Sequence, residues 1–203
     1  MLFVTTLPVW LFAVQTETKQ FERELDAGKQ AAGQGDYPEA LGHFTKANNL
    51  REDKCSECLV WLARIEMAKG NLRQALDWTE KASASAAGGP ERASAQLYLG
   101  IVLTRQGNLG QAETAFKAAS AANPACVECK FNLGFVLLKE AKDNEGVAVL
   151  KTVVSQFADR RWDDHDVATP SLAADFNYAI FTSGVVLRTS VRALAAWRCT
   201  RAA

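Results

Sequence analysis

Two cysteine pairs with the same spacing are the residues of this chain best suited to chemistry. Cys55 and Cys58 enclose Ser-Glu, and Cys126 and Cys129 enclose Val-Glu, so both pairs have the form C-x-E-C. Such a pair can close a local disulfide, act as a redox couple, or supply two of the four ligands of a zinc ion. The choice among these three depends on the elements that carry the cysteines.

Other kinds of chemistry have few residues available. His43 and His165 are the only histidines, and the sequence contains no phosphate-loop, serine-hydrolase or zinc-peptidase motif. Residues 159–166 combine aspartates with a histidine, but no regular spacing directs those side chains at one point. We therefore interpret that stretch as a solvated loop, and we expect no enzyme activity, no metal ion and no cofactor.

The charge balance excludes further classes of function. The 203 residues include 23 Lys and Arg and 23 Asp and Glu, so no net field attracts nucleic acid or an anionic membrane. Hydrophobic residues make up 48% of the chain, which is ample for one elongated helical domain. We expect the partner to be another protein or peptide.

A submotif with a period near 35 residues organises most of the chain. Its most complete copy runs from Leu99-Gly100 through Gly107-Asn108 and Ala112-x3-Phe116 to Asn123-Pro124. The small residue of the first helix recurs at Gly28, Ala63, Gly100 and Gly134, and the turn glycine recurs at Gly35, Gly70 and Gly107. Small residues allow two helix backbones to approach closely, and glycine ends a helix so that Asp or Asn can cap the next one.

This pattern resembles the tetratricopeptide repeat family. The resemblance implies an all-α fold, an α-solenoid of stacked antiparallel helix pairs, with four repeats between residues 18 and 157. The second repeat departs at Thr79, where an aromatic residue is usual, and we expect Trp78 beside it to fill the space. The fourth repeat has Lys142-Asp143 for its turn and Gly146 for its alanine.

In this register the two cysteine pairs occupy the loop-to-helix entry of the second and fourth repeats. A solenoid separates positions two repeats apart, so we do not expect one zinc ion to join the pairs. A redox couple would normally need thioredoxin-type surroundings, whereas these are helical. We favour a structural role, as buried thiols or, in an exported protein, as disulfides Cys55–Cys58 and Cys126–Cys129, each contributing roughly 2 kcal/mol before strain.

The resemblance also implies a concave groove, lined by the first helix of each repeat, that holds a peptide or a partner helix. We expect an apolar floor with one cation in each of the first three repeats, and Asn132 matches the family asparagine that bonds a peptide backbone. An alternative is that some of the apolar residues pack against each other or against the chain's own termini. The expected inward positions are Leu25, Lys29, Val60, Arg64, Met67, Leu97, Ile101, Arg105, Phe131, Phe135 and Leu138.

The N-terminus resembles a secretory signal. Leu2 to Val14 is an uncharged apolar run, too short to span a membrane, and polar residues follow it. We expect residues 1–16 to be a signal peptide and the protein to be periplasmic or secreted. The alternative is an apolar helix that caps the first repeat of a cytoplasmic protein, although Pro8 disfavours it.

We expect residues 158–203 to form a loop followed by a partial fifth repeat, a capping helix or a truncated domain. The stretch from Pro170 to Thr189 loosely resembles the start of extracytoplasmic thioredoxin-like oxidoreductases, but Trp197-Arg198-Cys199 lacks the second cysteine of that family's W-C-x-x-C. Two functions follow from these features. We expect a non-catalytic interaction module, and the alternative is an adaptor segment of a thiol-disulfide oxidoreductase whose catalytic domain is missing from this chain.

Overall fold

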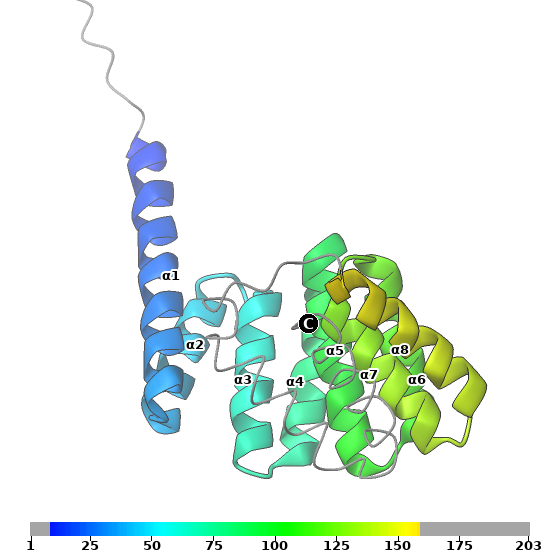
Figure 1. Cartoon of the computed structure of the whole chain (residues 1–203). Helices are drawn as coiled ribbons and strands as arrows, with labels where there is room; N and C mark the ends of the chain where they lie inside the picture. Colours follow the sequence, from blue (N-terminus) through cyan, green and yellow to red (C-terminus); the bar gives the residue numbers. More distant parts are fainter. Residues whose placement is uncertain (1–8, 159–203) are drawn as a thin grey trace, which may run out of the picture. The chain divides into compact units, whose positions relative to one another are not determined.

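The computed structural model describes residues 9–158, with side chains from 16 to 153, and all regular structure in that range is helical (Figure 1). The chain divides into units of residues 1–153 and 154–203. The expected thioredoxin-like tail and Cys199 lie outside the described residues. The helices are α1 (Val9–Gln34), α2 (Tyr37–Asn49), α3 (Ser56–Ala68), α4 (Leu72–Ser85), α5 (Gly89–Gln106), α6 (Leu109–Ala122), α7 (Val127–Lys139) and α8 (Asp143–Ala158).

The helices of residues 9–153 pack as consecutive pairs. α1 contacts α2, α3 contacts α4 and α5 contacts α6 most extensively, while the first helices also contact each other, α3 with α5 and α5 with α7. This arrangement, visible along the numbered helices of Figure 1, confirms the predicted α-solenoid of helix pairs.

The first helix starts earlier than the repeat pattern indicates. α1 begins at Val9 and continues unbroken past residue 16, where we expected a signal peptide to end. Within residues 9–158, no helix has both the length and the apolar character that crossing a membrane requires. Removal of the N-terminal segment stays a prediction.

Left-handed residues make the turn inside each helix pair. Gly35, Gly70 and Gly107 have φ of +80°, +82° and +84°, a conformation that glycine adopts without a steric penalty. In the fourth repeat the equivalent residue is Ala141, with φ of +59°. The sequence had suggested Lys142-Asp143 as this turn, but α8 already begins at Asp143. The left-handed conformation of this alanine lowers the free energy of unfolding by about 1 kcal/mol relative to an unstrained backbone.

The polar residues after these glycines occupy the N-cap positions of the following helices, as predicted, but only one of them caps through its side chain. Asp36 accepts a hydrogen bond from the Glu39 N–H at 3.1 Å. Asn71 and Asn108 are the N-cap residues of α4 and α6 without a side-chain capping bond. Asn71 instead donates to Glu66 Oε2 at 2.6 Å. Burial alone would raise the pKa of Glu66, but the hydrogen bonds from Asn71 and Lys69 outweigh it and lower the pKa.

Each pair is held together by a small residue on the first helix that meets a large residue sixteen positions later on the second. A methyl group added at Gly28 would lie 2.8 Å from Phe44 Cε1. One added at Gly100 would lie 2.5 Å from Phe116 Cε1, and one at Gly134 would lie 2.7 Å from Leu150 Cγ. None of these spaces accepts a side chain, because real Cβ atoms stay beyond about 3.0 Å.

The second repeat fills the same space with a larger residue on its first helix and a smaller residue on its second helix. Ala63 carries a methyl group where the others have glycine, and Thr79 is the smaller partner; both are fully buried. Trp78, which we expected to fill the space, packs against the edge of the core. It is half-buried and lies under the Lys81 ammonium, 4.6 Å from the ring centre. The Thr79 hydroxyl donates to the Ala75 and Leu76 carbonyls, so its polar atom is satisfied inside the core.

An ion cluster ties α6 to the turn between α7 and α8. Lys117 and Lys142 donate to the two carboxylate oxygens of Glu113 at 2.6 and 2.7 Å. Lys142 also contacts Glu140 at 3.0 Å. The hydrogen bonds from Lys117 and Lys142 outweigh burial and lower the pKa of Glu113 to about 2.

The size match between paired helices predicts a non-additive double mutant. We expect Gly100→Ala to lower the free energy of unfolding by about 2 kcal/mol through overpacking, and Phe116→Thr by about 3 kcal/mol through the cavity it leaves. The double variant recreates the Ala63 and Thr79 pair. Its loss of unfolding free energy should therefore be at least about 1 kcal/mol smaller than the sum of the losses of the two single variants. Urea unfolding followed by circular dichroism measures all three.

Gly42→Ala is the control, because a methyl group there meets nothing within 4 Å in the middle of α2. We expect it to stabilise the protein by about 0.5 kcal/mol. Strictly additive effects of Gly100→Ala and Phe116→Thr would contradict the size match.

The Glu113 cluster predicts a pH-dependent contribution to stability. The pKa of Glu113 is about 2 in the folded chain and 4.5 without these contacts, so its stabilisation is complete above 4.5 and is lost as pH falls toward 2. Glu113→Gln should therefore cost about 1.5 kcal/mol at neutral pH and much less near pH 3. Urea unfolding at both values tests this, with the exposed Glu80→Gln as control. A cost that grows on acidification would refute it.

Candidate functional site

The cations of the expected groove connect neighbouring first helices. Lys29 Nζ on α1 lies 2.8 Å from Glu57 Oε1 on α3. Arg105 on α5 reaches back to α3, where its NH1 group donates to the Met67 carbonyl at 3.3 Å. Both groups therefore position one repeat against the next.

Arg64 makes a third connection of this kind through aromatic rings. Its guanidinium carbon lies 3.8 Å from the ring centre of Trp61 on the same helix and 5.2 Å from that of Tyr98 on α5. Stacking on two rings desolvates the guanidinium while leaving its edge able to donate hydrogen bonds.

The apolar residues of the expected groove divide into a buried and a reachable set. Val60 and Leu97 are only 5% and 4% exposed and belong to the core, as do Leu25 and Met67. A partner has little access to them. Half-buried surface remains farther along, on α5 and α7, at Ile101, Phe131, Phe135 and Leu138.

Asn132 is engaged within its own helix. Its Nδ2 group donates to the Glu128 carbonyl at 2.9 Å, one turn earlier on α7. On the same helix, Lys139 Nζ lies 4.9 Å from the centre of the Phe135 ring. α7 therefore presents two half-buried aromatic rings beside an amide and a cation.

His43, one of the two histidines, has a structural partner. Its Nδ1 atom lies 2.7 Å from Glu24 Oε2, which joins α2 to α1. Glu24 is 8% exposed, and the hydrogen bond to His43 is the main cause that lowers its pKa. This contact holds α2 against α1.

Each cysteine pair lies at the start of a first helix. The S–S distance is 2.06 Å between Cys55 and Cys58 and 2.00 Å between Cys126 and Cys129. Cys55 is the N-cap of α3 and Cys126 that of α7, and each sulfur accepts a hydrogen bond from the N–H of its partner cysteine at 3.1 Å. Among the described side chains, no three His, Cys, Asp or Glu residues converge as a metal site.

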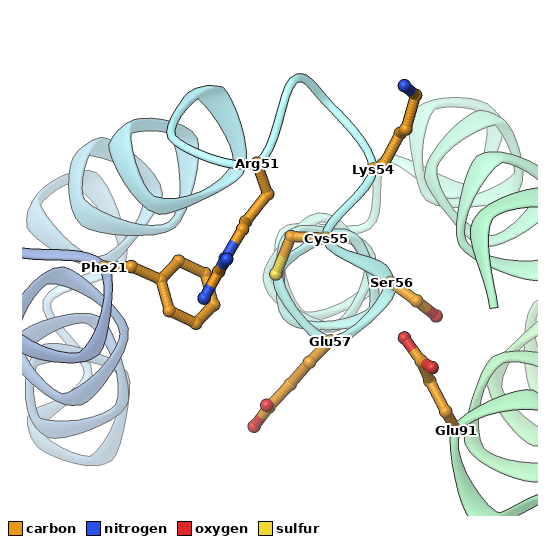
Figure 2. A pocket seen from close by; sticks show the side chains of 7 residues that line it. All are labelled: Phe21, Arg51, Lys54, Cys55, Ser56, Glu57 and Glu91. Carbon is orange, nitrogen blue, oxygen red and sulfur yellow. The ribbon is translucent and has the colours of Figure 1, made fainter. Parts of the chain in front are cut away.

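A small open pocket lies against the first cysteine pair, where α1, the α2–α3 loop and α5 meet. It encloses about 330 Å³ and is lined by Phe21, Arg51, Lys54, Cys55, Ser56, Glu57 and Glu91 (Figure 2). The guanidinium carbon of Arg51 lies over the Phe21 ring, 4.3 Å from the ring centre. The sequence pattern did not indicate this pocket, because it depends on a loop in which Glu52 and Asp53 are both left-handed (φ +52° and +61°).

Solved structures share this fold at low sequence identity. MamA residues 41 to the end from Desulfovibrio magneticus RS-1 is 20% identical, covers 70% of this chain and 78% of its own, and has a TM-score of 0.59. YrrB, described as a TPR protein with an unusual peptide-binding site, is 15% identical, with 89% and 95% covered and a TM-score of 0.57. The O-GlcNAc transferase of Thermobaculum terrenum matches over 60% of this chain but only 22% of its own, at 21% identity and a TM-score of 0.54.

A search of curated protein sequences finds no significant match. The family model described as Tetratricopeptide repeat matches residues 25–90, 62–125 and 99–146, which together span more than half of the chain. These windows include both partners of the pairs at Gly28, Ala63 and Gly100, and they end at residue 146, before Leu150 of the fourth pair. On this match and the paired-helix packing, the chain belongs to the tetratricopeptide repeat family.

Proposed function

We propose that this chain is a non-catalytic interaction module that binds an extended or helical segment of another protein along its first helices. The observation that carries the proposal is the half-buried surface of α5 and α7, where Ile101, Phe131 and Phe135 lie with Arg105 and Lys139 on the same two helices. When a partner covers a half-buried aromatic side chain, it removes apolar surface from water and so contributes binding free energy. A side chain that is already buried has no such surface left to contribute.

The charges on this surface favour a particular kind of segment. Arg105 is exposed and Lys139 lies against the Phe135 ring, so acidic side chains of a partner would meet cations beside an apolar contact. Arg64 is already held against the Tyr98 ring and adds positive charge without needing to be ordered, whereas the charge of Lys29 is partly compensated by Glu57. Asn132 would grip backbone only after exchanging its bond to Glu128. The segment we expect is apolar with acidic groups.

We further propose that the protein acts in the periplasm or outside the cell. The apolar run from Leu2 to Val14 and the two cysteine pairs support this, because disulfides persist in oxidising compartments. Expression of the full chain in a bacterial host, followed by N-terminal sequencing of the periplasmic fraction, should give a product that has lost its first residues. An intact N-terminus on protein retained in the cytoplasm would refute export.

The binding surface predicts an order of mutational effects. Peptides selected from a random display library on the purified chain serve as probes, and their affinity is measured by titration at low and high salt. Phe135→Ala should weaken binding by about 2 kcal/mol, roughly thirtyfold, because an anchor is lost. Arg105→Ala should mainly slow association and reduce the salt dependence.

Matched controls lie on second helices, away from the proposed surface. Val147→Ala on α8 removes an apolar side chain that is 40% exposed, and Arg73→Ala on α4 removes an exposed cation. Both should leave binding unchanged. If either weakens binding as much as its counterpart, the peptides dock elsewhere and the assignment to α5 and α7 fails.

A further inference from the structure

We propose that the Cys55–Cys58 pair is a thiol-disulfide exchange site, which external thiols reach through the pocket beside Cys55. The site lies at the α2–α3 loop, whereas the proposed peptide surface lies on α5 and α7. Either proposal can therefore fail without the other.

The two sulfurs differ in access. Cys55 lines the pocket and retains 8% of its exposed surface, whereas Cys58 is fully buried. Figure 2 shows the Cys55 sulfur on the side of α3 that faces Phe21 and Arg51. An incoming thiol can consequently attack only one sulfur of the pair. This division into an attackable and a buried cysteine is what a dithiol needs to form and then resolve a mixed disulfide.

The surroundings of Cys55 stabilise a thiolate at that sulfur. It is the N-cap of α3, at the positive end of the helix dipole, and it accepts the Cys58 N–H at 3.1 Å. Arg51 lines the same pocket and adds positive charge, whereas Lys54 is paired with Glu52 at 3.1 Å and Glu91 adds a carboxylate on the α5 side. Glu57, which also lines it, is paired with Lys29 at 2.8 Å, so its charge is partly compensated. A stabilised thiolate is a better leaving group when the mixed disulfide is resolved.

The backbone around the pair is held independently of the disulfide. The Cys55 N–H donates to Asn48 Oδ1 at 3.1 Å, and Asn48 Nδ2 donates to Asp53 Oδ1 at 2.9 Å. The Ser56 hydroxyl donates to the Ala82 carbonyl at 3.0 Å, which ties the start of α3 to α4. These bonds remain when the S–S bond opens, so the pair can be reduced and reoxidised in a folded chain.

The exchange proceeds in two balanced steps. The thiolate of an external thiol bonds to Cys55 Sγ, the S–S bond breaks, and its electron pair leaves on Cys58 Sγ, which takes up a proton. A second external thiolate then attacks the outer sulfur of the mixed disulfide and expels the Cys55 thiolate. Two external thiols are oxidised to one disulfide, and the chain gains two electrons and one proton, with a second proton taken up when the Cys55 thiolate is protonated. In the reverse reaction an external disulfide reoxidises Cys55 and Cys58.

The test uses the full chain with the other cysteines replaced, Cys126→Ser, Cys129→Ser and Cys199→Ser. It is equilibrated in mixtures of reduced and oxidised glutathione, trapped with a maleimide and analysed by mass spectrometry. We expect the fraction reduced to change smoothly with the glutathione ratio while the helical circular dichroism signal persists. A pair that stays oxidised until the helices unfold is a structural staple, and that result would overturn the proposal.

A second arm tests the route through the pocket. Arg51→Gln removes one positive charge, so it should slow reduction by glutathione about two- to threefold more than reduction by 2-mercaptoethanol, because the glutathione thiolate carries one more negative charge. Arg73→Gln, which removes an exposed cation on α4, should change neither rate. Equal effects of the two substitutions on the glutathione rate would show that attack does not pass beside Arg51, and the assigned site would be wrong.

Discussion

The distance between the two helices of each repeat depends on one steric contact, and the rest of the fold follows from it. At Gly28, Gly100 and Gly134 the partner side chain comes closer than a Cβ atom would permit. Interiors are packed at crystal density, so this contact sets how near the second helix can lie and therefore where the first helices of successive repeats meet. The proposed peptide surface on α5 and α7 and the cysteine pairs at the starts of α3 and α7 are both placed by that spacing.

The cations that the sequence placed in the groove also connect neighbouring repeats. Lys29, Arg64 and Arg105 each connect two first helices, by an ion pair, by ring stacking and by a hydrogen bond to backbone. Groups held in this way lose little side-chain entropy when a ligand arrives. The same contacts oppose sliding of one repeat over the next, so the proposed binding face is already defined in the free chain.

The fold was predictable because its determinants are local and recur. The turn glycines, the small residues and the aromatic partners of the first and third repeats all occur where the pattern indicates. Side-chain partners were not predictable in the same way. The side chain of Asn71 was expected to cap α4, but its Nδ2 group donates to the buried carboxylate of Glu66 instead. Val60 and Leu97 were expected in the groove, yet adjacent repeats bury them, because burial depends on distant helices. The pocket beside Cys55 depends on two left-handed non-glycine residues that no motif marks.

The pairing of sizes also limits how such a gene can be rearranged. Because each small residue and its partner lie within one repeat, duplication or deletion at the loops between helix pairs keeps matched partners together. A crossover at a turn glycine would instead join the first helix of the second repeat to the second helix of the third. The methyl group of Ala63 would then face the ring of Phe116, the encounter that Gly100 avoids at 2.5 Å. Viable recombinants should therefore have their junctions between helix pairs.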